Sequence, residues 1–170
     1  MRVASSRLLR DGRIHVETLI RAPFDEVWTH TQNPALHRRW DARFSDIRYL
    51  PRPSLEEPQR FEYTRRVLPG IAIRGTGATV GDRRRVHGTA TSALQFGSSH
   101  PLSPIVRGSG FWQYVPTPEG VRFITEYDYV PRWGRMGRVV DRLLIRPVMA
   151  WLTAWSFDRL RRWLEEGVQP

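Results

Sequence analysis

Cysteine and lysine are both absent from the 170 residues of this chain. Without cysteine there is no disulfide, no thiolate nucleophile and no thiolate metal ligand. Without lysine there is no Schiff base, no P-loop lysine and no lysine general base. Long apolar runs are lacking too, because Asp141, Arg142 and Arg146 interrupt the most apolar stretch and leave too few residues to span a bilayer. We therefore predict no transmembrane helix.

Acidic residues are few: 17 aspartates and glutamates stand against 27 basic residues, all arginine, for a net charge of +10. Such a charge favours acidic partners, namely nucleic acid, anionic lipid or a carboxylated ligand. The arginines are spread along the chain, however, and the densest cluster, residues 83–85, has no aromatic residue beside it on which a base would stack. We expect no nucleic-acid partner and leave open a peripheral contact with an anionic membrane and the oligomeric state.

In the first part of the chain, local sequence signals predict where one strand and two helices begin and end. Residues 14–20, IHVETLI, alternate between two faces and predict a strand. Asp25 and Glu26 then lie where the positive end of a helix dipole favours carboxylates, so a short helix is expected there. The pair Asn33-Pro34 predicts the end of that helix and the start of a second short one.

From residue 43 onward the apolar pattern has a period of two, which is typical of strands. We predict further strands at 44–50, 59–68, 71–80, 83–96, 108–115 and 121–130. A tight turn at Gly81-Asp82 is expected to join the third and fourth of these. Gly75 and Gly77 lie within one predicted strand and indicate strong local bending of the sheet.

The chain after residue 130 has a helical pattern, with apolar residues at spacings of three and four and arginines on much of the opposite face. Pro147 is expected to kink or divide this helix, at a cost of ~3 kcal/mol. A helix this apolar has to bury its surface, and we predict that Trp151, Trp155 and Trp163 lie in the core or in a cavity wall. The alternative is a helix lying on a membrane surface, for which arginine opposite tryptophan and leucine is also typical.

This order of elements resembles the SRPBCC superfamily of START domains, pollen-allergen-like proteins and polyketide cyclase/dehydrase-like proteins. The resemblance rests on RAPFDEVW after the first strand, on Trp40, and on YDYVPRWGRMGRVVDRLLIRPV entering the last helix. It implies an α+β helix-grip fold, in which a curved antiparallel sheet of about six to seven strands wraps the long C-terminal helix, with two short helices after the first strand. It also implies an apolar cavity between sheet and helix. We expect one domain over residues 1–170, with its core at about 14–166.

Strand residues supply the candidates for ligand binding. Arg48 and Arg65 would bind a ligand carboxylate or phosphate if they point inward, and would be ordinary solvated arginines if the strand phase is the opposite one. Tyrosine and tryptophan would add an aromatic wall with hydroxyl and N–H groups. The full set of predicted ligand-binding residues is Arg48, Tyr63, Arg65, Trp112, Tyr114, Phe123, Tyr127, Trp151 and Trp155.

Metal and nucleophile motifs are missing. The five histidines show no metal-ligand spacing, and no serine lies in a GxSxG motif. We therefore predict no metal and no cofactor, and the sequence points to no catalytic residue.

Three functions fit these patterns, and we favour the first, binding of a hydrophobic small molecule such as a lipid, an isoprenoid or a polyketide-like aromatic. The second is an enzyme similar to polyketide cyclases and dehydratases, in which His30, His87, Arg65 or Tyr127 would polarise a carbonyl. A hydroxyl or imidazole in the cavity near a second polar group would support the enzyme, and an apolar lining would exclude it. The third is arginine-driven association with anionic membranes or nucleic acid, which would weaken as salt rises.

The last two expectations concern the location of the protein in the cell and the access of a ligand to the cavity. The N-terminal residues MRVASSRLLRDGRIHVE contain no apolar h-region, so we expect no signal peptide and predict a cytoplasmic protein. Whether the loop at 97–108 gates the cavity is left open at this stage.

Overall fold

The computed structural model describes residues 4–54, 57–84 and 88–170. Its elements are β1 (Ser5–Leu8), β2 (Ile14–Ile20), α1 (Phe24–Gln32), α2 (Pro34–Trp40), β3 (Asp46–Tyr49), β4 (Gln59–Leu68), β5 (Ile71–Arg84), β6 (Ala90–Gly97), β7 (Ile105–Thr117), β8 (Gly120–Pro131), α3 (Gly134–Val140), the π-helical turn η1 (Asp141–Ile145) and α4 (Arg146–Glu166).

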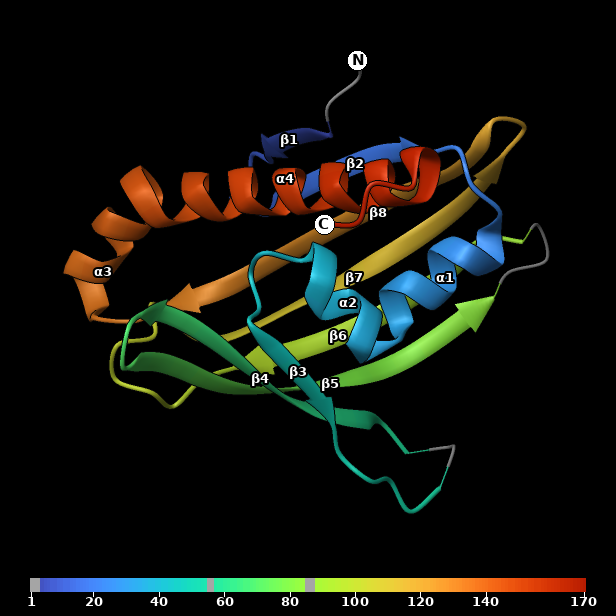
Figure 1. Ribbon diagram of the computed structural model, residues 1–170. Helices are drawn as coiled ribbons and strands as arrows, with labels where there is room; N and C mark the ends of the chain where they lie inside the picture. The colour runs from blue at the N-terminus through green and yellow to red at the C-terminus, as the bar shows by residue number, and fades with distance from the viewer. Residues whose placement is uncertain (1–3, 55–56, 85–87) are drawn as a thin grey trace.

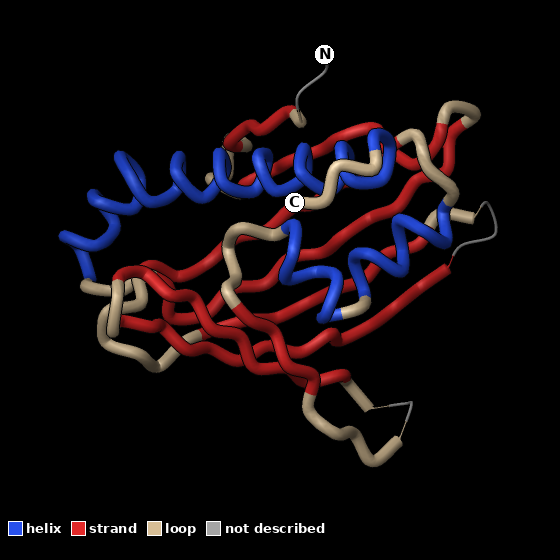
Figure 2. The backbone as a smooth tube through the Cα atoms, in the orientation of Figure 1, coloured by secondary structure: helices blue, strands red, loops and turns tan. Residues whose placement is uncertain are grey.

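A curved antiparallel sheet holds the long C-terminal helix against one face, which confirms the predicted helix-grip fold (Figure 1). The eight strands lie in the order β1-β2-β8-β7-β6-β5-β4-β3, and α1 and α2 pack beside α4 on the same face (Figure 2). The sheet has one strand more than the predicted upper limit. The additional strand, β1, has the sequence SSRL and pairs with β2 at the sheet edge. This pairing is made by backbone groups and needs no alternation of apolar residues, so SSRL has no recognisable strand pattern.

The two short helices begin as local rules predict. The Asn33 side chain accepts a hydrogen bond from the Ala35 N–H at 2.9 Å, and Pro34 occupies the first turn of α2. An asparagine N-cap followed by proline pre-organises a helix start, because proline has no N–H to satisfy there. This boundary places His37 and Trp40 on the buried side of α2.

The predicted turn at Gly81-Asp82 is wrong. β5 continues to Arg84, and Asp82 pairs with Ser92 in the ladder to β6. The register shifts between Thr79 and Gly81, as it does at a β-bulge, for which glycine is also well suited. The chain therefore reverses after Arg84, in a region that includes residues outside the described part.

Pro147 lies in the first turn of α4, directly after the π-helical turn η1. A proline inside a regular helix clashes with the carbonyl four residues earlier. The wider π turn changes the hydrogen-bond pattern there, so the helix is divided at the place where Pro147 predicted a break.

Small side chains, and not the tryptophans, form most of the buried face of α4. The buried residues of this helix are Ala150, Thr153, Ala154, Ser156, Phe157, Leu160 and Arg161. Trp151 is 60% exposed and Trp155 is 44% exposed, so their predicted burial is wrong. Alanine, serine and threonine let the helix lie close to the sheet, which leaves the large side chains on the outer side. Trp163 is partly buried against the core, in agreement with its predicted place.

Cross-strand pairs of an aromatic residue and a glycine line part of the inner face of the sheet. Phe61 pairs with Gly77 across β4 and β5, and Phe96 pairs with Gly108 across β6 and β7. A Cβ atom added to either glycine would overlap the ring of its partner. The glycines therefore let the aromatic rings lie flat against the strands where the sheet curves.

We expect Gly77→Val to lower the free energy of unfolding by about 1–3 kcal/mol, because its side chain would displace the Phe61 ring in a packed region. Urea denaturation followed by tryptophan fluorescence measures the change. Ala78→Val, one residue further on and facing the other side of the sheet, is the control and should shift the stability by much less. Equal losses in both variants would contradict the proposed role of Gly77.

Candidate functional site

A cavity of about 200 Å³ lies between the inner face of the sheet and α4. α4 contributes Met149 and Leu152 to its wall, and α2 contributes His37. Strand and loop residues provide most of the apolar lining, namely Phe44, Ile47, Ile73, Leu94, Phe96 and Ile105. A dry cavity of about 150 Å³ suffices for benzene, so this space fits a compact molecule of one ring or a short branched chain.

Three polar side chains of this lining, His37, Arg43 and Tyr127, lie together with the fully buried Asp41, and we call these four residues the polar corner. Asp41 caps the end of α2, and its side chain is 0% exposed. Arg43 donates from Nε to Asp41 Oδ1 at 2.9 Å and from Nη2 to Oδ2 at 2.7 Å. His37 Nε2 lies 2.9 Å from Asp41 Oδ2, because a spacing of four residues brings both side chains to one side of the helix end.

Their mutual attraction keeps the buried side chains of Asp41 and Arg43 charged. Burial alone would raise the pKa of Asp41, but the Arg43 guanidinium and the hydrogen bond from His37 hold that pKa well below its usual range. The carboxylate is therefore ionised at neutral pH and accepts hydrogen bonds only. His37 then donates from Nε2, and among the described residues no group hydrogen-bonds its other ring nitrogen, Nδ1. Because His37 belongs to the cavity lining, Nδ1 is the candidate atom of this ring for contact with a ligand.

The aromatic surroundings fix the His37 ring. Its centroid lies 4.9 Å from that of Trp40, 5.5 Å from that of Phe44 and 4.9 Å from that of Trp112. Rings packed at these distances restrict rotation of the imidazole. The polar corner is therefore a rigid feature within an apolar cavity.

Tyr127 adds a hydroxyl to the polar corner. Its OH lies 2.8 Å from Thr153 Oγ1, and the Arg43 guanidinium carbon lies 5.6 Å from its ring centroid. Burial raises the pKa of Tyr127, and it raises the pKa of Tyr63, which donates to the Gly97 carbonyl, to about 12. Both phenols are therefore protonated at neutral pH. Tyr63 donates its proton to the Gly97 carbonyl, and Tyr127 donates to Thr153, because the Thr153 hydroxyl itself donates to the Met149 carbonyl at 2.7 Å.

Four of the nine predicted ligand-binding residues line the cavity: Tyr63, Arg65, Trp112 and Tyr127. Within this group Arg65 already donates to the Ala42 carbonyl, so part of its hydrogen-bonding capacity is used by the protein. Tyr114 and Phe123 are fully buried in the core next to the cavity and do not belong to its lining.

The other three predicted residues lie elsewhere. Trp151 and Trp155 are exposed on the outer side of α4. Arg48 is exposed and donates to Glu62 at 2.6 Å, because Ile47 takes the inward position of β3 and alternation turns Arg48 outward. For this residue the strand phase is the opposite of the one that a binding role requires.

Of the predicted enzyme candidates, His30 lies outside the cavity, where its ring packs on Trp163 at 4.6 Å. His87 lies outside the described residues. Sequence reasoning missed His37, Asp41 and Arg43, although the HRRWD spacing of His37 and Asp41 carries a signal, since residues four apart on a helix are neighbours.

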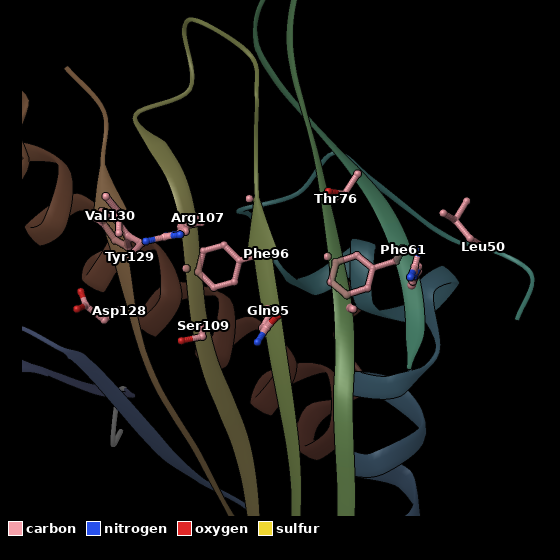
Figure 3. A pocket seen from close by; sticks show the side chains of 15 residues that line it. Leu50, Phe61, Thr76, Gln95, Phe96, Arg107, Ser109, Asp128, Tyr129 and Val130 are labelled. Carbon is pink, nitrogen blue, oxygen red and sulfur yellow. The ribbon is translucent and has the colours of Figure 1, made fainter. Parts of the chain in front are cut away.

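A second hollow lies on the other face of the sheet, and Figure 3 views it with the helices behind the strands. Polar side chains on this outer face include Gln95, Arg107, Ser109 and Asp128. Apolar ligands bind mainly through enclosed apolar surface, and this hollow offers little of it. The enclosed cavity under α4 is therefore the better candidate site. In the described part of the chain, no group of three or more histidine, aspartate or glutamate side chains is arranged to hold a metal ion.

Comparisons with known proteins agree with this architecture. No family model matches the chain. An uncharacterized membrane protein of Bacillus subtilis, YndG, is 45% identical over 163 residues, which are 95% of this chain and 60% of that protein. The chain thus spans less than two thirds of this relative. None of the helices in the described ranges has the length and apolarity needed to cross a membrane.

Three solved structures illustrate the structural similarity. The di-domain ARO/CYC protein StfQ of the steffimycin pathway has a TM-score of 0.68 and 14% identity, over 92% of this chain and 52% of that one. Human StAR-related lipid transfer protein 5 has a TM-score of 0.64 and 17% identity, over 96% and 82%. A STAR-related lipid transfer protein of Xanthomonas axonopodis has a TM-score of 0.63 and 16% identity, over 93% and 99%. The predicted resemblance is confirmed at the level of the fold: this chain has an SRPBCC-type helix-grip fold.

Proposed function

We propose that this chain binds a small hydrophobic molecule that carries one polar group, with the apolar part in the cavity under α4. The observation that carries this proposal is the polar corner in a mainly apolar cavity between the sheet and α4. Burying the apolar part of a ligand contributes ~25 cal/mol per Å². His37 Nδ1 would accept a hydrogen bond from a ligand hydroxyl. The Arg43 guanidinium would favour a ligand oxygen that carries negative charge.

The ligand class follows from the cavity size and from the names of the neighbours. Two of the similar structures are named lipid transfer proteins and one is named an ARO/CYC protein. A space of about 200 Å³ favours a compact aromatic or isoprenoid unit over a long acyl chain, which would need the walls to move apart. A phenol or another alcohol on one ring is the simplest molecule that suits both the lining and the polar corner.

An enzyme of the cyclase or dehydratase kind is the second candidate, and the polar corner favours it too. His37 is held by an ionised carboxylate, as general bases often are, and Tyr127 would donate to a carbonyl oxygen in the same cavity after turning its hydroxyl away from Thr153. Such an enzyme would release its product, so that little bound compound would remain after purification.

The first test is the binding of p-cresol, which has one ring and one hydroxyl. We expect saturable binding to the wild-type protein by calorimetry. Leu94→Trp should abolish it, because the larger side chain fills the cavity. His37→Phe should weaken binding on the order of five- to tenfold, since one hydrogen bond contributes about 1 kcal/mol.

His30→Phe is the matched control, because His30 lies outside the cavity and its loss should leave binding unchanged. Equal weakening by the His30 and His37 variants would contradict the role of the polar corner. Organic extracts of protein purified from its own host, compared by mass spectrometry with extracts of Leu94→Trp, would then identify a natural ligand. A cytoplasmic location stays a prediction, which cell fractionation would test.

A further inference from the structure

An exposed apolar surface follows the helical region from α3 into α4. Met136 is 73% exposed, Leu143 is 74% exposed and Leu144 is 59% exposed. We call this surface the helical patch, and its members are Trp133, Met136, Val139, Val140, Leu143, Leu144, Val148, Trp151 and Trp155. Scattered apolar side chains are normal on protein surfaces, but a continuous set of this size marks an interaction site.

Two features of the fold produce the helical patch. α3 and the start of α4 extend beyond the ends of the neighbouring strands, so little of the sheet lies beside them (Figure 1). Further along, small residues face the sheet and the large ones face outward, where the Trp151 and Trp155 rings stack with centroids 5.9 Å apart. The patch is therefore a consequence of how the helix packs.

Positive charge accompanies the patch. Arg135, Arg138 and Arg142 are exposed and alternate with its apolar members along the sequence. Residues 129–157 contain one acidic residue, Asp141, which is 3% exposed and paired with Arg146 at 2.9 Å. The patch thus combines apolar side chains with arginine and shows no exposed carboxylate within this segment.

Two loops at the same end of the molecule have the same character. The β4–β5 turn exposes Val67 and Leu68, and the β6–β7 connection exposes Leu102. Residues 65–74 and 98–107 contain no acidic residue. Figure 1 shows both loops at the end from which α3 projects, and Arg132 donates to the Ser98 carbonyl, so these segments are neighbours.

The charge of the patch distinguishes between two partners that would cover its apolar side chains, a second copy of this chain and an anionic membrane. In a symmetric dimer the exposed arginines of one patch would face those of the other, without carboxylates to pair with them. A membrane that contains anionic lipid supplies both an apolar interior and negative headgroups. Tryptophan and arginine are the side chains suited to the level of those headgroups.

We infer that the helical patch docks this protein on the surface of anionic membranes, with the apolar side chains inserted at the headgroup boundary and Arg135, Arg138 and Arg142 against lipid phosphates. Met149 of α4 and Ile105 after the β6–β7 loop belong to the cavity wall. Docking would therefore bring one end of the ligand cavity close to the bilayer, which is where a hydrophobic ligand dissolves.

Vesicle sedimentation tests this inference with the full chain. The wild-type protein should sediment with vesicles of phosphatidylglycerol and phosphatidylcholine and bind phosphatidylcholine vesicles far more weakly. The double variant Leu143→Asp/Leu144→Asp should lose this binding. Val80→Asp/Val168→Asp adds the same charge on β5 and beyond the end of α4, at sites that are each 45% exposed, and should bind much like the wild type.

The arginine contribution needs its own pair of variants. Replacing Arg135, Arg138 and Arg142 by glutamine should weaken partitioning on the order of a hundredfold, because each arginine near an anionic surface contributes about 1 kcal/mol, or about fivefold, at low salt. A control triple with the same net charge replaces Arg52, Arg60 and Arg122, which are exposed on the β3–β4 loop, β4 and β8, and should weaken it much less. Circular dichroism would verify that all variants fold.

Three results would overturn the inference. The first is absence of wild-type binding to the phosphatidylglycerol vesicles at low salt. The second is an equal loss in the patch variants and in their controls, which would indicate a general effect of net charge. The third is a dimer by analytical ultracentrifugation that the Leu143/Leu144 variant dissociates while vesicle binding is absent, which would assign the patch to a second copy of this chain. Failure of p-cresol binding would leave these results unaffected.

Discussion

Arg43→Met is expected to lower the free energy of unfolding by about 3–5 kcal/mol, because it leaves the Asp41 carboxylate buried without its cation. Asp41 is 0% exposed and takes two hydrogen bonds from the Arg43 guanidinium. Only the hydrogen bonds from His37 and from the backbone N–H of residue 43 would remain to that carboxylate. Urea denaturation of the wild type and the variant measures the difference.

Two further variants make this prediction specific. Glu62→Gln removes the 2.6 Å pair with Arg48, but both side chains are about half exposed or more, so the stability should change by less than ~1 kcal/mol. The double variant Asp41→Asn/Arg43→Met removes both buried charges and should be less destabilised than Arg43→Met alone. If Arg43→Met lowers the free energy of unfolding no more than Glu62→Gln does, the buried Asp41–Arg43 pair does not stabilise the fold as predicted.

The same pair predicts a loss of stability in acid. The folded state holds the pKa of Asp41 below its ordinary value of 3.8, so the unfolded chain binds the proton more readily. The contribution of Asp41 is therefore fully present above that value and is lost as the pH falls through it toward the lower folded pKa. Unfolding midpoints measured from neutral pH into this acidic range should fall more steeply for the wild type than for the double variant.

Phe157→Ala is expected to cost about 3–5 kcal/mol of stability, whereas Trp155→Ala, two residues earlier, should cost less than ~1 kcal/mol. Phe157 is 0% exposed and stacks on Phe123, with ring centroids 4.5 Å apart. Trp155 is 44% exposed, and its ring contacts Trp151 and Arg159 on the outer side of α4. Trp155 should therefore contribute less to the stability of the fold than Phe157, although its side chain is larger.

Thermal unfolding followed by circular dichroism would measure both changes. Phe157→Leu retains most of the buried apolar volume and should recover a large part of the stability that Phe157→Ala loses. If Trp155→Ala proves as destabilising as Phe157→Ala, the orientation of α4 would have to be different, and the helical patch would lose its basis.

Local rules explain why so much of the fold could be predicted. The Asn33-Pro34 pair ends one helix and starts the next through a side-chain cap, which needs no distant partner. The strands from β4 to β8 follow period-two patterns because each has one face toward the core. The resemblance to SRPBCC proteins supplied the remaining arrangement, the sheet wrapped around the last helix. The aromatic lining of the cavity, including Tyr63, Trp112 and Tyr127, also follows from these strand patterns.

Pairing at a distance explains what could not be predicted. β1 is held by its backbone ladder to β2, which leaves no pattern in SSRL. The polar corner depends on Arg43, which comes just after α2 and turns back onto Asp41 under the sheet. A charged side chain beside a helix end gives no sign in the sequence that it will be buried, because burial depends on what later strands place over it.

The orientation of α4 shows the same division between sequence and tertiary structure. The sequence by itself determined that the C-terminal region is a helix, that it is rich in arginine and large apolar residues, and that Pro147 divides it. It did not determine which side faces the sheet, since each residue advances an α-helix by about 100° and the wider π turn η1 advances it by less. The close packing of Ala150 and Ala154 against the sheet decided that side, because small residues permit the shortest distance between helix and strands, and it left Trp151 and Trp155 outside.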